Sequence, residues 1–344
     1  MIKPKALRRG DRIATLSPSS GIAGEEPIRW RYELGARRLT DIYGFEVVAM
    51  PNSLRGMAFN DRHPEARAED LMQAFADRSI KAIICNIGGE DSIRMLPHLD
   101  LSVIRDNPKV VSGFSDSTTV HMICRKAGLM TFYGPAVLTD FAENLGIFSY
   151  TSEYFAKAVM RAGPVGEVVP AGFWTSEFLD WNDRQKNARG RNVASSAGFE
   201  RISGRGKAQG PLLGGCLSVL YRIKDTAVFP GKDEWDGAVA FIETSETMPP
   251  PDLFESYLRG IMEKGALAGA SALLFARPYG NMHARQYHEI LERLLSVEAG
   301  RSDMPIIAGL PFGHTSPIIT IPIGAFAEAD ADECKVNITE AGVS

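Results

Sequence analysis

The sequence is short of cysteine, of long apolar runs and of any excess charge of one sign. Its four cysteines show no C-x-x-C spacing and indicate buried, reduced thiols, which excludes a disulfide framework and a zinc site; they are Cys85, Cys124, Cys216 and Cys334. Lysine and arginine number 38 against 42 aspartates and glutamates. The net charge of -4 therefore gives no general electrostatic reason to bind nucleic acid or an anionic membrane.

We also expect no segment for membrane crossing or export. The longest apolar runs, such as Ala270–Ala276, are far too short to span a bilayer. The basic start Met1-Ile-Lys-Pro-Lys5 precedes no apolar stretch of the kind that a signal peptide needs. The 344 residues are 44% hydrophobic and 23% charged, close to the globular average. We therefore expect a cytoplasmic, enzyme-sized protein of about two domains.

The first 165 residues alternate short apolar runs with helical patterns. Strands are expected at Ile13–Ser17, Phe45–Met50, Ala82–Ile87 and Lys109–Ser112. Helices are expected between them, for example at 63–77. This rhythm of near-continuous apolar strands and helices predicts an α/β domain with a parallel sheet covered on both faces. Ligands of such sheets bind at the carboxyl ends of the strands.

Residues 166–210 interrupt this rhythm and separate the first domain from a second at 211–344. The stretch 183–207 holds seven lysines or arginines and two acids and is rich in Gly, Asn and Ser. It predicts a surface loop or linker, either merely solvated or serving as a basic lid over an anionic substrate. Trp174 and Trp181, just upstream, favour the lid because exposed tryptophans in such segments usually have a partner.

Three polar residues each follow an apolar strand: Ser115, Glu243 and His314. A serine hydroxyl becomes a good nucleophile when a base accepts its proton, and histidine suits that role. A carboxylate on the other ring nitrogen fixes the tautomer and stabilises the imidazolium. The sequence thus predicts a Ser–His–Glu catalytic triad.

The segment Gly113-Phe-Ser-Asp-Ser117 differs from the G-x-S-x-G nucleophile elbow at its last position but keeps the order of strand, turn and helix. The amide of Asp116 lies near a helix N-terminus, where negative charge is favoured. Gly88 and Gly89, at a neighbouring strand end, could supply a second donor to an oxyanion hole. The alternative interpretation is an ordinary N-cap at Ser115 and an ordinary turn at Gly88-Gly89.

Other chemistry is not indicated. The segment His288-Glu289-Ile-Leu-Glu292 begins like H-E-x-x-H but lacks the second histidine, so we expect no metal. The segment Gly204-Arg-Gly206-Lys-Ala-Gln-Gly210 misses a dinucleotide fingerprint by one position and follows no predicted strand.

Taken together, the motifs resemble the LD-carboxypeptidase family of serine peptidases, particularly its microcin C immunity (MccF-like) branch. The resemblance covers nearly the whole chain and rests on Ile87-Gly-Gly-Glu-Asp91, Gly113-Phe-Ser-Asp116, Thr131-Phe-Tyr-Gly-Pro135, Leu213-Gly-Gly215, Phe241-Ile-Glu-Thr-Ser-Glu246 and Gly313-His314. It implies that Ser115 is the nucleophile, His314 the general base and Glu243 its partner, with an oxyanion hole from Gly88, Gly89 and Asp116.

The resemblance also implies a flavodoxin-like or class I amidotransferase-like N-terminal domain, a smaller α/β C-terminal domain, a homodimer, and no metal or cofactor. One departure is Cys216, where relatives often carry Asn.

Two substrate classes compete within the family. LD-carboxypeptidases remove the terminal D-alanine from murein tetrapeptides, whereas the MccF-like branch cleaves the amide between an amino acid or peptide and a nucleotide. The segments 243–246 and 173–182 resemble the second branch, in which the tryptophan matching Trp181 stacks on adenine. Trp174 is expected to help bind the substrate. A second alternative, which is not an enzyme, is a nucleotide- or peptide-binding protein of the same fold.

Overall fold

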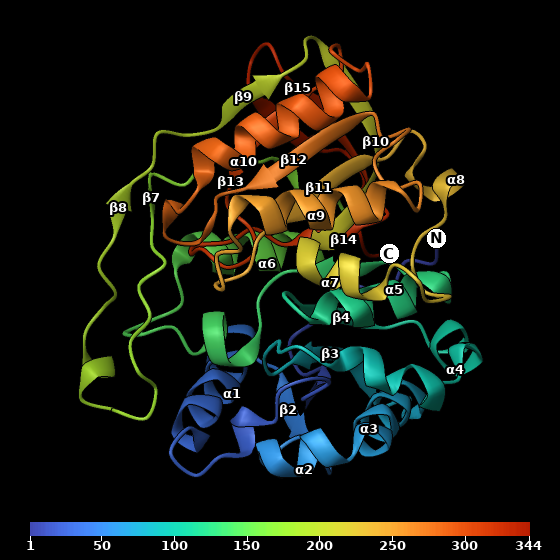
Figure 1. Ribbon diagram of the computed structural model, residues 1–344. Helices are drawn as coiled ribbons and strands as arrows, with labels where there is room; N and C mark the ends of the chain where they lie inside the picture. Colours follow the sequence, from blue (N-terminus) through green and yellow to red (C-terminus); the bar gives the residue numbers. More distant parts are fainter.

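The computed structural model describes residues 1–344, which form an α/β protein with two large sheets and a small two-stranded one. Figure 1 shows the N-terminal sheet, in blue and green, below a C-terminal sheet in yellow to red. The two chain ends lie together, because the amide of Ser344 donates to the carbonyl of Pro4 at 2.9 Å. None of the helices combines the length and the apolar character that crossing a bilayer requires.

The first sheet has the strand order β14-β5-β4-β3-β1-β2. Its strands are β1 (Arg12–Leu16), β2 (Glu46–Ala49), β3 (Ile80–Cys85), β4 (Val110–Gly113), β5 (Thr131–Tyr133) and β14 (Ile321–Ile323). Strands β1 to β5 run parallel, as the sequence predicts, and β14 pairs with β5 in the antiparallel sense. The central strands β3 and β4 are almost wholly buried because helices cover both of their faces.

The helices of this part are α1 (Arg29–Tyr43), α2 (Met57–Arg62), α3 (Pro64–Ala76), α4 (Leu101–Asp106), α5 (Ser117–Lys126) and α6 (Ser149–Val159). Short helical turns are η1 (Ile22–Gly24), η2 (Ser92–His98) and η3 (Val137–Phe141). Helix α1 packs against η3, whereas α3, α4 and α5 pack in sequence against one another. Helix α1 ends at Gly44, whose φ of 76° is a left-handed C-cap conformation that glycine adopts without strain.

The second sheet is mixed, with the order β6-β16-β15-β10-β11-β12-β13-β9. Its parallel centre consists of β10 (Lys207–Cys216), β11 (Val239–Glu243), β12 (Ala272–Ala276) and β13 (Ile306–Leu310). Antiparallel strands extend both edges: β6 (Gly166–Glu167), β9 (Glu200–Ser203), β15 (Phe326–Asp330) and β16 (Lys335–Ile338). This second sheet forms a half-barrel. The expected α/β fold, with a parallel N-terminal sheet and a second α/β unit, is confirmed.

Helices α7 (Leu217–Ile223), α8 (Lys232–Trp235), α9 (Pro251–Met262) and α10 (Ala284–Leu291) belong to this second part, with η5 (Tyr279–Asn281) and η6 (Glu292–Glu298). Helix α9 buries Phe254, Leu258 and Ile261, which share one face at helical spacing. Helix α7 packs against both α5 and α9, so the helices of the two parts form one continuous layer. One apolar core extends through both sheets.

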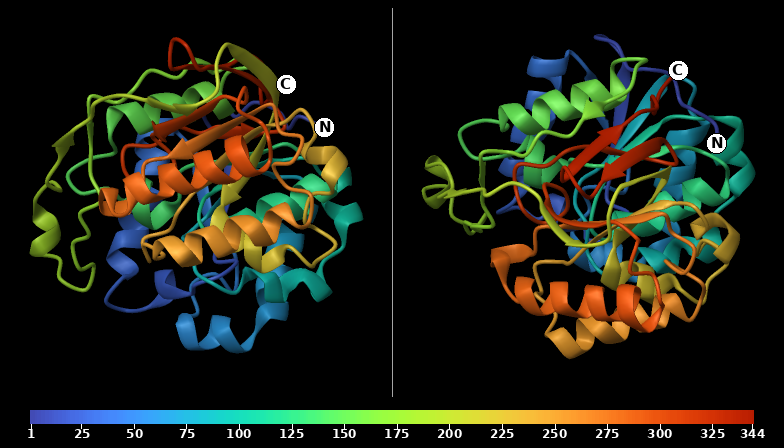
Figure 2. Two further views of the ribbon diagram at one scale, coloured as in Figure 1. Left: turned by 45° about the horizontal axis from the view of Figure 1, so that its top comes forward. Right: turned by 90° about the horizontal axis from the view of Figure 1, so that it is seen from above.

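The segment 166–210 differs from the predicted loop or linker. It contains β6 and β9, and also β7 (Phe173–Trp174), which pairs with β8 (Ala194–Ser195), and the turn η4 (Lys186–Ala188). These strands have only two to four residues, which is too short to show a hydrophobic period in the sequence. Only their backbone pairing identifies them. Figure 2 shows the part around β7 and β8 running along one side of the molecule.

Candidate active site

Ser115 lies in the tight turn between β4 and α5. Its φ of 61° is in the left-handed region, which is uncommon for a residue with a side chain and typical of a strained nucleophile turn. The N-cap of α5 is Asp116, so Ser115 is not the ordinary N-cap of the alternative interpretation. The turn thus presents the Ser115 hydroxyl to the space beyond the carboxyl end of the sheet.

The structure brings the three predicted catalytic side chains together. Nε2 of His314 lies 3.0 Å from Oγ of Ser115, and Nδ1 of the same ring lies 2.6 Å from Oε2 of Glu243. Ser115 follows β4, Glu243 ends β11 and His314 follows β13, so the carboxyl ends of both parallel sheets meet here. An imidazole held between a hydroxyl and a carboxylate can accept the hydroxyl proton while the carboxylate stabilises the resulting charge.

Gly313 allows this contact between the sheets. Its φ is 81°, and a Cβ atom at this position would lie 2.5 Å from Cδ of Glu243. Any side chain here would therefore strain the backbone and push the Glu243 carboxylate away. Glu243 itself is buried, whereas the side chain of His314 remains 9% exposed.

Tyr133 is a functional candidate that the sequence analysis did not single out. Its hydroxyl donates to Oε1 of Glu243 at 2.5 Å and accepts from the amide of Ser115 at 3.1 Å. It therefore connects the carboxylate to the backbone of the nucleophile turn. The available signal was the motif Thr131-Phe-Tyr-Gly-Pro135, but an apolar strand ending in tyrosine is equally typical of a core position.

A second carboxylate, from Glu246, also contacts the histidine. Its Oε2 atom lies 2.9 Å from Nε2 of His314. Burial of the ring lowers the pKa of His314, but Glu243 and Glu246 outweigh this effect and raise the pKa to about 10. The hydrogen bond to His314 lowers the pKa of Glu246 to about 2. These carboxylates therefore favour the imidazolium form of His314.

The residues expected to form an oxyanion hole lie beside Ser115. A Cβ atom on Gly88 would lie 2.8 Å from Oγ of Ser115 and 3.2 Å from the amide nitrogen of Asp116, so only glycine fits there. One on Gly89 would instead meet Ser19, at 2.3 Å from its Oγ.

The buried side chain of Asp116 has a role of its own, because it accepts hydrogen bonds from Ser19, Ser92 and Arg222. These contacts connect the start of α5 to segments near Ser19 and Ser92 in the first part of the chain and to helix α7 in the second.

A cavity of about 360 Å³ opens in front of Ser115 and His314. Trp181 lines it, with its ring 4.5 Å from the guanidinium of Arg31. Arg31 is held in turn by Asn144 and Asn187 at 2.9 and 3.2 Å. The position of the indole ring is therefore set by a buried, hydrogen-bonded arginine.

Trp174 does not line this cavity. It lies in β7, where its ring stacks on the guanidinium of Arg277 at 5.1 Å. Both tryptophans belong to the same segment, but strand pairing directs only the loop beyond β7 towards the triad. Sequence proximity alone does not reveal this difference.

The basic stretch 183–207 is largely neutralised by acids. Arg189 forms two hydrogen bonds to Glu177, and Lys207 contacts Glu328. Of its seven cations only Arg191 lines the cavity with the triad, and Arg191 is bonded to the buried carboxylate of Glu143. The stretch thus covers part of the site without presenting a free positive surface to it.

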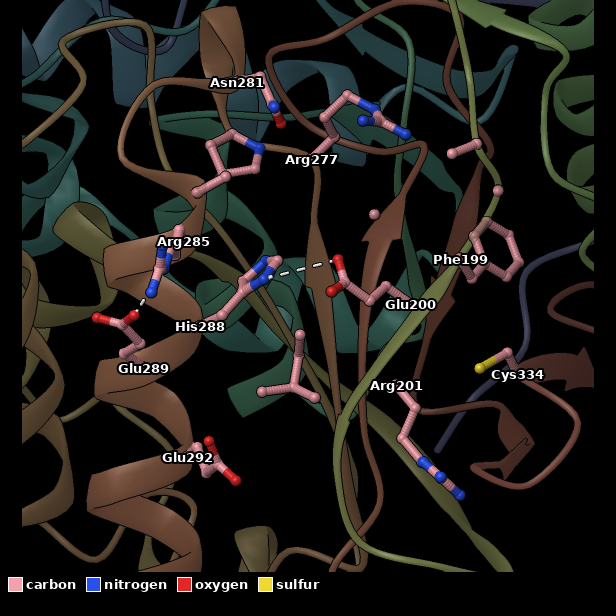
Figure 3. Close-up of a pocket in the computed structure, with 16 residues that line it drawn as sticks. Phe199, Glu200, Arg201, Arg277, Asn281, Arg285, His288, Glu289, Glu292 and Cys334 are labelled. Carbon is pink, nitrogen blue, oxygen red and sulfur yellow. Dashed lines mark hydrogen bonds and ion pairs between the residues drawn. The ribbon is translucent and has the colours of Figure 1, made fainter.

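A larger cavity, of about 850 Å³, lies away from the triad, between β9 and α10 (Figure 3). His288 lines it and faces Glu200 at 3.8 Å. No group of three or more His, Cys, Asp or Glu side chains is arranged to hold a metal ion. All four cysteines are free, and three of them are buried.

Comparisons with known proteins agree with this geometry. Residues 13–134 match the LD-carboxypeptidase N-terminal domain, and residues 209–329 match the LD-carboxypeptidase C-terminal domain. A MccF-like protein from Streptococcus pneumoniae, solved in complex with AMP, is 33% identical, with a TM-score of 0.88 over 95% of this chain and 98% of that chain.

Two further relatives differ in their described activity. The microcin C7 self-immunity protein MccF of Escherichia coli is 29% identical over 86% of this chain and 85% of its own length. Its structure with aspartyl sulfamoyl adenosine has a TM-score of 0.83, 27% identity and full coverage of both chains. A probable murein peptide carboxypeptidase of Bacillus subtilis is 28% identical over 99% of this chain and 95% of its own length.

Both domains of the family match this chain, and a relative of 33% identity covers nearly all of it. These matches establish family membership. The chain belongs to the LD-carboxypeptidase family of serine hydrolases and is a hydrolase similar in structure to MccF.

Proposed function

We propose that this protein hydrolyses the amide bond between an amino acid or peptide and a nucleotide, and so detoxifies microcin C-type aminoacyl nucleotides. The observation that carries the proposal is the cavity shared by Ser115, His314 and Trp181. A planar indole suits a nucleobase, and stacking between a base and an aromatic ring is worth about 1–3 kcal/mol. Relatives solved with AMP and with aspartyl sulfamoyl adenosine support a nucleotide in this cavity.

In the proposed reaction, Oγ of Ser115 attacks the acyl carbonyl carbon while Nε2 of His314 takes the hydroxyl proton. Glu243 stabilises the imidazolium. The amide N–H groups near Gly88 and Asp116 stabilise the oxyanion, where each donor contributes about 3 kcal/mol.

Collapse of the tetrahedral intermediate breaks the C–N bond, and His314 returns its proton to the leaving nitrogen. Water then attacks the acyl-enzyme, with His314 again acting as the base.

A murein peptide is the second candidate substrate. The observation in its favour is that the Bacillus subtilis probable murein peptide carboxypeptidase is as similar to this chain as MccF is. A tetrapeptide ends in a carboxylate, and Arg31 and Arg191 line the cavity. Both guanidinium groups are already engaged, Arg31 by Asn144 and Arg191 by Glu143, so neither is a free receptor for that carboxylate.

The test is a substrate panel with one enzyme preparation. Aminoacyl-sulfamoyl adenosines and a murein tetrapeptide are incubated in parallel, and chromatography measures sulfamoyl adenosine and D-alanine. The proposal predicts release of sulfamoyl adenosine and the free amino acid. Release of D-alanine with intact adenosine compounds would assign the murein activity. Tight binding of the nucleotide without any product would assign a non-catalytic binding protein.

A further inference from the structure

Glu246 is the one carboxylate in the cavity whose partner belongs to the triad. Three acidic side chains line the cavity: Asp140, Glu177 and Glu246. Asp140 accepts from the amide of Ala136 and the hydroxyl of Thr139, and Glu177 is paired with Arg189. Glu246 contacts only the ring of His314 and keeps 59% of its side chain exposed.

Glu246 lies where it can contact a positive charge next to the scissile carbonyl of a bound substrate. Ser115 Oγ and Glu246 Oε2 lie 3.0 and 2.9 Å from the same ring nitrogen of His314. A carbonyl carbon poised for attack lies about 3 Å from the nucleophile. In an α-amino acid, the amino nitrogen is about 2.5 Å from its own carbonyl carbon, given standard bond lengths. An α-ammonium group can therefore reach the carboxylate without moving the carbonyl.

We propose that Glu246 binds the free α-ammonium group of the residue that supplies the scissile carbonyl. The inference rests on the proposed function and narrows its substrates to aminoacyl nucleotides with an unblocked amine at that residue. In a murein tetrapeptide, or in a peptidyl nucleotide, this nitrogen is part of an amide and carries no charge. Glu246 is thus a specificity determinant within the MccF-like site.

The same contact links substrate binding to the state of the base. Nε2 of His314 is shared between the Ser115 hydroxyl and the Glu246 carboxylate, and a contact with a carboxylate requires a proton on the nitrogen. An ammonium group that binds Glu246 weakens the contact of this carboxylate with the ring and so lowers the pKa of His314. The Nε2 proton then leaves to water, and Nε2 can accept from Ser115.

The titratable groups that face the ring or its carboxylates are Glu243, Glu246, Tyr133, Cys216 and Tyr279.

The experiment compares two isosteric probes, alanyl-sulfamoyl adenosine and lactyl-sulfamoyl adenosine, in which a hydroxyl replaces the ammonium group. The wild type should have a kcat/KM about 10- to 100-fold higher for the alanyl probe, the range expected for a hydrogen bond to a charged group. Glu246→Gln should abolish this preference, so that the ratio of the two kcat/KM values falls to about one. Glu69→Gln, an exposed position on α3, is the matched control and should keep the ratio.

The ratio of the two kcat/KM values reports recognition of the ammonium group, because a change in the basicity of His314 that is common to both probes cancels in the ratio. An unchanged ratio in Glu246→Gln, or a wild type that hydrolyses both probes equally well, would overturn the assignment while leaving the proposed function intact. Failure of the wild type to hydrolyse either probe would overturn both.

Discussion

The hydroxyl of Tyr133 donates a hydrogen bond of 2.5 Å to Oε1 of Glu243. The hydroxyl oxygen of Tyr133 also accepts a hydrogen bond from the amide of Ser115. The Tyr133 side chain therefore connects the proposed nucleophile to the acid of the triad. Tyr133 and Glu243 are both buried, and the other carboxylate oxygen of Glu243, Oε2, contacts His314. Tyr133 is therefore a positioning residue that holds the Glu243 carboxylate next to the imidazole of His314.

Replacing Tyr133 by Phe should lower kcat by about 10- to 100-fold with little change in KM, because Glu243 loses a donor but the substrate loses no contact. The buried carboxylate oxygen left without a partner should also cost about 1–3 kcal/mol of unfolding free energy. Steady-state kinetics and urea denaturation measure the two effects.

Tyr43→Phe is the control, because it removes another tyrosine hydroxyl, 2.8 Å from Ser152 and remote from the site. A kcat in Tyr133→Phe that equals the kcat of Tyr43→Phe would refute the positioning role.

Substituting Gly313 by Ala should displace Glu243 and reduce kcat by about 100-fold or more, since the added Cβ would lie 2.5 Å from the carboxylate carbon. Gly300→Ala is a matched control: Gly300 also has a positive φ, 67°, but has nothing within 4 Å of an added Cβ. Both variants should lose about 1–3 kcal/mol of stability from backbone strain, and only Gly313→Ala should lose activity. Equal activity in the two variants would contradict the close approach of Gly313 to Glu243.

Trp181→Ala should lower kcat/KM for an aminoacyl-sulfamoyl adenosine by about 5- to 100-fold, the range expected for one lost base stack. Trp181→Phe should retain most of the activity because a phenyl ring also stacks. Trp174→Ala should have a much smaller effect, since its indole packs on Arg277 outside the cavity. A larger loss from Trp174→Ala than from Trp181→Ala would contradict the proposed nucleotide subsite.

The pH dependence of kcat/KM should reflect the raised pKa of His314. The base must be neutral to accept a proton, so kcat/KM falls as the pH drops below this pKa. Glu243 and Glu246 raise it to about 10, and kcat/KM should therefore still increase with pH above the ordinary histidine value of about 6.5.

In Glu246→Gln one stabilising charge is gone, so the acid limb of the profile should move to lower pH. An acid limb centred near pH 6.5 in both proteins would disprove this electrostatic description.

The sequence predicts the parallel sheet and the meeting of Ser115, Glu243 and His314 because each follows an apolar strand. Strand ends of parallel sheets share an edge, so a local pattern carries long-range information there. The hydrophobic pattern does not predict the pairing of β14 with β5, which adds residues 321–323 to the N-terminal sheet. A strand of three residues has no period to detect, and its partner lies far away in the sequence.

The sequence motifs contain Tyr133 and Glu246 but do not assign a role to either residue, and they do not separate Trp174 from the cavity. Tyr133 occupies a buried strand end, where a tyrosine is expected for packing alone. Glu246 lies three residues after Glu243 in an irregular loop, and its contact with His314 depends on the path of that loop. The two tryptophans are seven positions apart, and only the pairing of β7 with β8 distinguishes them.

The most direct test of the account is the turnover of an aminoacyl-sulfamoyl adenosine by Ser115→Ala, in protein shown by calorimetry still to bind the compound. Loss of the attacking hydroxyl should reduce kcat by about 10⁶-fold, as in other serine triads. A kcat within about tenfold of the wild type would contradict attack by Ser115 and with it the proposed mechanism.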